Sequence, residues 1–292
     1  MKYHLSKEVM TDDAMRTSFN ELAVKTFGIS FEDWYQKDYW NNSNIPYTLF
    51  DGEKAISNIS VNRMKILWQG QIYNYIQLGT VMTASEYRNQ GLSRYLMEEV
   101  MKDWESQCDD IFLFANKKVL DFYPKFGFKK ELQYSFQKDI HQINHTSHPV
   151  QKLHMNSMND VEKLKKYYSK TNPFSKLQAI DNYSLLMFYC SSPMKDFVYY
   201  SPQYDAIVIA EQDGNTFNCF DIYCDKGKDL FDILFSVAAI GTNTINLEFT
   251  PIDNTSFDIN PIEDDNNTLF LLNSNGNIFK NEKLLFPEIS HT

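Results

Sequence analysis

The spacing of apolar residues along the chain predicts an ordered series of helices and strands. Apolar positions three and four residues apart in residues 14–27 predict a helix that ends at Gly28. A short aromatic helix is expected within residues 30–40. Two strand-like runs then meet at Asp51-Gly52, a dipeptide typical of a β-hairpin turn.

The next part of the chain changes abruptly from strand to helix. Strand-like residues continue to about Thr83, and helical spacing runs from about Gly91 to Trp104, with a polar stretch between them. Three further elements are expected in order: a strand over residues 110–115, a short helix over 116–123 that Pro124 ends, and a strand within 126–140.

The second half repeats part of this order. A hairpin is expected at Asp213-Gly214, and residues 228–251 again read as a helix followed by a strand. No counterpart of the polar stretch before Gly91 occurs there. The pattern indicates a degenerate duplicate of the first half; a chance likeness of two such patterns is the alternative.

A length of 292 residues fits two domains of about 150 residues. The chain becomes polar and rich in histidine over residues 139–153, and we place the boundary there, with domains over 1–140 and 150–292. The histidines in or beside this stretch match no zinc spacing, so they indicate a solvated linker, and no metal site is predicted. They are His141, His145, His148 and His154.

Charge and cysteine content narrow the class of protein. The formal net charge of -10 disfavours binding to nucleic acid or to an anionic membrane. Four scattered cysteines form no disulfide framework, and the first residues contain no secretory signal, so we expect a cytoplasmic protein. No apolar run is long enough to span a bilayer.

The polar turn before Gly91 has the features of an anion site. The first turn of a helix exposes unpaired N–H groups and partial positive charge, which favour phosphate. Gly91 lets a bulky anion approach the backbone, and Ser93 is small enough to leave the first turn open. Taken alone, the turn is equally compatible with an ordinary capped surface helix.

A second motif follows downstream. Asn116 is followed by Phe122-Tyr123 and then by Gly127-Phe128, after the Arg-x-x-Gly-x-Ser turn. These two motifs resemble those of the GNAT superfamily of N-acetyltransferases, whose signature is [QR]-x-x-G-x-[GA] followed by the second motif. The resemblance covers residues 1–138. Ser93 departs from that signature only by a small hydroxyl.

The resemblance implies a mixed-sheet α/β acetyltransferase fold, followed here by a smaller α+β acetyltransferase-like domain, and acetyl-CoA as cosubstrate. Backbone groups of Val81 and Thr83 would then hold the pantetheine arm. Asn116 would hydrogen-bond the cofactor where the central strands separate, and Tyr123 would lie near the thioester sulfur. For these two, a helix cap and a packing aromatic are the structural alternatives. The pyrophosphate would bind the amides of Arg88, Asn89, Gln90, Gly91, Leu92 and Ser93.

The implied chemistry needs a base and an acid. An amine acceptor is mostly protonated near neutral pH, so a base must remove its proton, and Tyr123 could protonate the departing thiolate. Glu32, Asp33 or a water chain are candidates for the base. Tandem acetyltransferases of the enhanced intracellular survival type are similar and use a terminal carboxylate, which here would be Thr292; a frayed tip is the alternative.

These observations predict an N-acetyltransferase that acts on a primary amine of a small molecule or peptide. A non-catalytic acyl-CoA sensor or interaction protein is the competing class. Neither the particular acceptor nor an oligomeric state follows from the sequence. A group of aromatic residues in the N-terminal helices would line a cationic pocket or form a hydrophobic helix face. These are Phe31, Trp34, Tyr35, Tyr39 and Trp40.

Overall fold

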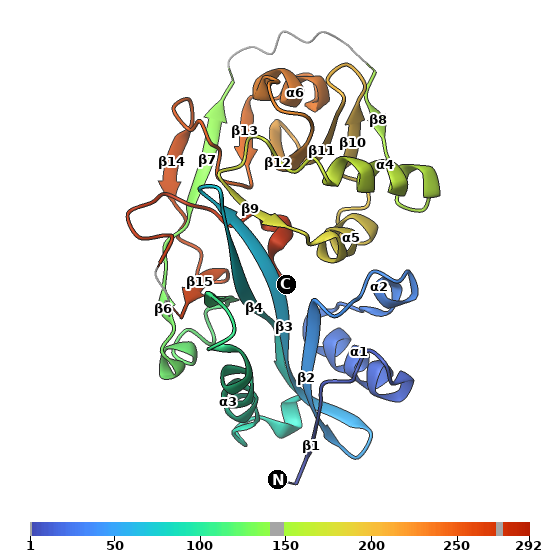
Figure 1. Cartoon of the computed structure of the whole chain (residues 1–292), viewed down its shortest axis with the longest axis vertical. Helices are drawn as coiled ribbons and strands as arrows, with labels where there is room; N and C mark the ends of the chain where they lie inside the picture. Colours follow the sequence, from blue (N-terminus) through green and yellow to red (C-terminus); the bar gives the residue numbers. More distant parts are fainter. Residues whose placement is uncertain (1, 141–148, 273–276) are drawn as a thin grey trace.

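The computed structural model describes residues 2–140, 149–272 and 277–292, and the chain folds around two mixed β-sheets (Figure 1). The first sheet occupies the lower part of the view and the second sheet the upper part, with β9 and α5 between them. Each sheet has its own clusters of buried apolar side chains. The predicted architecture, a mixed-sheet α/β unit followed by a second α+β unit, is confirmed.

The first sheet has the strand order β1-β2-β3-β4-β5-β15-β6, and β9 pairs with β3. Strands β2, β3 and β4 are antiparallel, whereas β4 and β5 are parallel and joined through helix α3. The strands are β1 (His4–Ser6), β2 (Asn44–Asp51), β3 (Lys54–Trp68), β4 (Gln71–Thr83), β5 (Asp110–Ala115), β6 (Lys129–Lys130), β9 (Leu177–Ile180) and β15 (Thr268–Leu271). Its helices are α1 (Asp13–Phe27), α2 (Glu32–Gln36) and α3 (Leu92–Trp104), with 3-10 turns η1 (Ser85–Tyr87) and η2 (Tyr123–Phe126).

Local sequence signals explain most of these elements. The Asp12 side chain accepts a hydrogen bond from Met15 N at the start of α1, and Gly28 ends the helix with a φ of 72°. The helix predicted over residues 116–123 is wrong: turns precede the 3-10 turn η2. So short a segment between a strand and a proline cannot offset the cost of helix nucleation.

The second sheet has the order β14-β7-β13-β12-β11-β10-β8. Antiparallel strands β10, β11 and β12 precede a parallel β12–β13 pair joined through α6. The strands are β7 (Tyr134–Asp139), β8 (Gln151–Lys152), β10 (Val198–Ser201), β11 (Ala206–Asp213), β12 (Thr216–Tyr223), β13 (Thr244–Leu247) and β14 (Asp258–Pro261). The helices are α4 (Met158–Tyr168), α5 (Tyr183–Ser191) and α6 (Leu230–Val237), with the 3-10 turn η3 (Glu288–Ser290).

The two sheets share one topology, which supports the inferred duplication. The β2-β3-β4-α3-β5 order of the first recurs as β10-β11-β12-α6-β13 in the second. Both predicted hairpins form, because Asp51 pairs with Lys54 and Asp213 pairs with Thr216 across two-residue turns. The second half thus keeps the architecture of the first.

The sheets also exchange strands. β15, from the second half of the sequence, lies between β5 and β6, whereas β7, from the first half, lies between β13 and β14. Sheet membership therefore does not follow the predicted division into residues 1–140 and 150–292. That division stays a prediction of how the chain is organised into domains. The exchange ties the two halves together through backbone hydrogen bonds.

Two of the sequence-based expectations concern membranes and metals. No described helix is long and apolar enough to cross a bilayer. Among the described residues, no group of three or more His, Cys, Asp or Glu side chains could hold a metal ion. His141, His145 and His148 of the histidine-rich stretch lie outside the described residues, and His154 follows β8.

Candidate functional site

The N-terminus of α3 is open. Gly91 precedes the helix with a φ of 78°, and no side chain caps the first turn. Asn89 also has a positive φ, of 62°, and residues 88–91 are exposed. Because a side chain is disfavoured at such a φ, glycine suits the position, and the backbone N–H groups of the first helical turn remain available to an anion.

The N-terminus of α6, the corresponding helix of the second sheet, is capped by a side chain. The Asp229 carboxylate accepts a hydrogen bond from Asp232 N, 3.0 Å away, at the N-terminus of α6. A carboxylate there occupies the N–H groups and repels a phosphate. The prediction that the second half lacks the anion turn therefore agrees with the structure.

Ser93 is turned away from the open turn. Its Oγ lies 2.9 Å from Thr83 Oγ1, which lies 2.8 Å from Ser57 Oγ. This chain of hydroxyls links α3 to the ends of β4 and β3. The serine thus replaces the usual small residue of the signature without obstructing the helix N-terminus.

Strand β4 contains a bulge just before the turn. Asn58 of β3 pairs with Met82 and Ser60 pairs with Gly79, so the register shifts, and Thr80 has a φ of 47°. The fully buried Asn58 donates from Nδ2 to Thr80 O at 2.9 Å. The bulge takes Val81 out of the regular ladder.

Asn58 is a site residue that the sequence analysis did not single out. Its Oδ1 accepts a hydrogen bond from Thr48 Oγ1 at 2.8 Å, so both ends of the amide are fixed from neighbouring strands. The available signal was an asparagine in the middle of a predicted strand, between Ser57 and Ile59, where burial requires hydrogen-bond partners.

The pairing of β4 with β5 ends just before the bulge. Their parallel pairing runs from Tyr75 and Asp110 to Leu78 and Leu113. The remaining residues of β4, which include Val81 and Thr83, therefore lie beside the opening between the strands, on the way to the turn. The structure brings these predicted cofactor-binding positions together with residues 88–93 in one continuous segment.

The last residues of the chain dock against this opening. Thr292 Oγ1 accepts a hydrogen bond from Asn62 Nδ2 at 2.9 Å, and a Cβ on Gly79 would lie 2.7 Å from the Thr292 main-chain oxygen. His291 stacks on Phe114 of β5, with ring centroids 3.7 Å apart. The alternative of a frayed tip is therefore wrong, because contacts with β3, β4 and β5 fix the segment.

Asn116 and Tyr123 belong to the second motif, which follows β5. Asn116 is exposed directly after β5, and its Oδ1 accepts a hydrogen bond from Lys118 N at 3.0 Å. Tyr123 is 3% exposed, and burial raises the pKa of its phenol to about 12. The Arg94 guanidinium lies over the Phe126 ring, 5.7 Å from its centroid, which places η2 beside the first turns of α3.

The acidic and aromatic residues of α2 have structural partners. Glu32 Oε2 pairs with Arg16 Nε and also accepts from Asn20 Nδ2, each at 3.2 Å. Among the described residues, the Asp33 side chain forms no hydrogen bond or ion pair. The Arg16 guanidinium also lies over the Tyr35 ring, 3.6 Å from its centroid. Glu32 thus belongs to a structural network, which weakens it as a candidate base.

The aromatic group forms a core. Trp34 and Trp40 are each 5% exposed, and their rings stack with centroids 5.4 Å apart. Phe31 stacks on Phe188 of α5. Trp34 Nε1 donates to Ser184 O at 2.8 Å. These contacts favour the hydrophobic face over a cationic pocket, and they join α2 to the second half.

Comparison with known proteins agrees with this geometry. Residues 10–130 match the family described as Acetyltransferase (GNAT) domain. The resemblance to the GNAT superfamily is therefore confirmed for residues 10–130, the part of the chain that matches this family. No protein with a curated description matches the sequence.

Solved structures share the fold over most of the chain. A probable N-acyltransferase from Enterococcus faecalis is 14% identical, with a TM-score of 0.62 over 94% of this chain and 74% of that one. The Eis1 protein of Mycobacterium abscessus is 13% identical, with a TM-score of 0.58 over 92% of this chain and 74% of that one. A GCN5-related N-acetyltransferase from Kribbella flavida is 12% identical, with a TM-score of 0.58 over 92% and 71%. At these identities the likeness concerns the fold of both halves.

Proposed function

We propose that the protein is an acetyl-CoA-dependent N-acetyltransferase that acts on a primary amine of a small molecule or peptide. The observation that carries the proposal is the open N-terminus of α3, preceded by the bulge in β4. A pyrophosphate has its donors in the amides of Arg88, Asn89, Gln90, Gly91, Leu92 and Ser93. The pantetheine arm would follow the backbone of Val81 and Thr83 toward the opening between β4 and β5.

The reaction would be direct attack of the neutral amine on the thioester carbonyl. The C–N bond forms, the tetrahedral intermediate expels the CoA thiolate, and the amine proton passes to a base. Asn116 would hold the cofactor at the end of β5, and Tyr123 would donate a proton to the sulfur. The pKa of about 12 keeps the Tyr123 phenol protonated at neutral pH, as a proton donor requires.

The docked C-terminal segment lies where acceptor and thioester would meet. Thr292 reaches Asn62 and Gly79 at the centre of the sheet, and His291 covers Phe114. Participation of the Thr292 carboxylate as the base stays a prediction. The formal charge of -10 favours a neutral or cationic acceptor over nucleic acid or an anionic membrane, and the four free cysteines suit the cytoplasm.

Thiol release separates the proposed enzyme from an acyl-CoA sensor. We expect acetyl-CoA to raise the melting temperature, because a ligand that binds only the folded state stabilises it. With a panel of amines, the enzyme releases free thiol and acetylated amine, detected by a thiol reagent and by mass spectrometry. Binding without release across the panel would favour the sensor, and absence of both heat and thermal shift would refute the cofactor site.

Replacing Tyr123 by phenylalanine tests the proton donor. We expect turnover to fall about 100-fold, the low end for a general acid, because burial makes this phenol a weak acid. The acetyl-CoA dissociation constant should stay within a few-fold, since the ring keeps its packing. Tyr75→Phe removes another buried hydroxyl from the same sheet and serves as the control. Unchanged turnover in Tyr123→Phe, at a pH where chemistry limits the rate, would leave Tyr123 a packing residue.

A further inference from the structure

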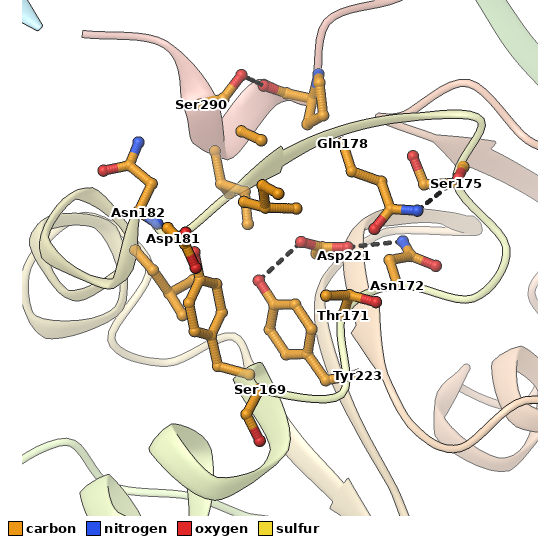
Figure 2. Close-up of a pocket in the computed structure, with 16 residues that line it drawn as sticks. Ser169, Thr171, Asn172, Ser175, Gln178, Asp181, Asn182, Asp221, Tyr223 and Ser290 are labelled. Carbon is orange, nitrogen blue, oxygen red and sulfur yellow. Dashed lines mark hydrogen bonds between the residues drawn. The ribbon is translucent and has the colours of Figure 1, made fainter. Parts of the chain in front are cut away.

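A cavity of about 260 Å³ lies between β9, the end of β12 and η3 (Figure 2). It is distinct from the anion turn. β9 pairs with residues 65–68, at one end of β3. The end of β4 that leads into the turn lies at the other end of β3, where Thr83 pairs with Ser57. The proposed acetyltransferase chemistry assigns no role to the polar residues of this cavity.

Asp221 of β12 is the central polar group. Its Oδ1 accepts hydrogen bonds from Asn172 Nδ2 at 2.6 Å and from Ile222 N at 2.9 Å, and its Oδ2 accepts from Tyr223 OH at 2.7 Å. Figure 2 shows the carboxylate in the middle of the lining residues. Since each carboxylate oxygen has two acceptor positions, Oδ2 keeps one for a ligand.

The carboxylate has no cationic partner among the residues that line the cavity. The described lining contains no lysine, arginine or histidine, and its other acidic residue, Asp181, pairs with Lys65 at 2.8 Å. Burial raises the pKa of Asp221 to about 6, so the group is still mostly ionised at pH 7.5. A buried negative charge of this kind is stabilised by a cation placed beside it.

Gln178 of β9 supplies a second acceptor. Its Nε2 donates to Ser175 O at 2.9 Å, which fixes the amide, while Oε1 is buried and has no hydrogen-bond partner among the described residues. The walls of the cavity combine hydroxyl and amide side chains with apolar and aromatic ones, which include Tyr168, Leu186 and Ile289. Two acceptors within such walls match an organic group that offers several N–H donors and a short apolar body.

We propose that this cavity binds a small organic cation through a primary ammonium group, which donates hydrogen bonds to Asp221 and Gln178. A metal ion fits less well, because no described group of three or more ligating side chains is present. The volume restricts the ligand to a compact amine or to the end of a longer one. This inference concerns binding and does not depend on the proposed acetyl transfer.

The cavity adjoins the docked C-terminal segment. Pro287, Ile289 and Ser290 form part of its wall. When the Gln77 amide nitrogen faces the segment, this nitrogen lies 2.9 Å from Ser290 O and 3.1 Å from Thr292 Oγ1. A bound amine would therefore contact the segment that reaches the centre of the first sheet, as either an acceptor or an effector.

Calorimetry with butylamine and 1,4-diaminobutane, with 1-butanol as the neutral analogue, tests the site at pH 7.5. We expect the two amines to bind and 1-butanol not to bind. Asp221→Asn should weaken amine binding about 10- to 100-fold, the value of a hydrogen bond to a charged group. Asp196→Asn, which alters a carboxylate that is paired with Lys152 and does not line the cavity, should change the affinity little.

Gln178→Met provides an independent variant that leaves the Asp221 network intact, and it should also weaken binding. Binding should decline as pH falls through about 6, because Asp221 becomes protonated there. Equal affinity of Asp221→Asn and the parent protein, or no heat with either amine, would overturn the proposal. Mass spectrometry after addition of acetyl-CoA then distinguishes the sources: an acetylated amine is an acceptor, and a bound, unmodified amine is an effector.

Discussion

Gly91→Glu is expected to lower the affinity for acetyl-CoA by about 100-fold or more, while the protein remains folded. The new carboxylate would lie at the open N-terminus of α3, where no protein atom lies within 4 Å of an added Cβ. Loss of charge-assisted hydrogen bonds to a pyrophosphate costs about 1.5 to 3 kcal/mol each, and like-charge repulsion adds to that loss. Calorimetry with acetyl-CoA measures the effect directly.

The fold should lose about 1 kcal/mol through the backbone, because Gly91 has a φ of 78° and a residue with a Cβ resists this conformation. Helix propensity would not compensate, since the residue precedes the helix. Gly214→Glu is the matched control: it has a φ of 56°, open space around the added Cβ, and a place in the β11–β12 turn of the second sheet. If both variants bind acetyl-CoA equally well, the turn is not the anion site.

Gly79→Ala is expected to displace Thr292 and to lower turnover about 100-fold, with acetyl-CoA affinity changed only a few-fold. The added Cβ would lie 2.7 Å from the Thr292 main-chain oxygen, closer than packed atoms allow, so the segment must move. Displacement of about 1 Å at a reacting centre can cost about 100-fold in rate. Steady-state thiol release and separate calorimetry measure the two quantities.

A double-variant cycle isolates the contact with Thr292. Deletion of residues 291–292 should reduce turnover by a similar factor, and Gly79→Ala added to that deletion should have little further effect. Additive losses in the combined variant would mean that Gly79 acts on β4 itself and not through the docked segment. Full turnover after the deletion would exclude the segment from the reaction.

Short-range sequence signals predicted the elements around the polar turn at Gly91. Helix α1 ends at Gly28 as predicted, and α3 begins after Gly91, because capping and apolar spacing depend on residues only a few positions apart. The two motifs, over residues 88–93 and 116–128, carried the resemblance to the GNAT superfamily, with which the match of residues 10–130 agrees. The helix expected over 116–123 failed where the segment was too short for its propensity to decide.

Local pattern in the sequence predicted the two hairpins, the repeated order of elements in the two halves and the polar turn at Gly91. Only the tertiary structure decided that β7 and β15 exchange sheets, that Thr292 meets Gly79, and that Asp221 and Gln178 face one cavity. The physical reason is that strand partners and cavities depend on which distant surfaces bury one another. Apolar periodicity specifies that a face is buried, and leaves its partner to the packing of the whole chain.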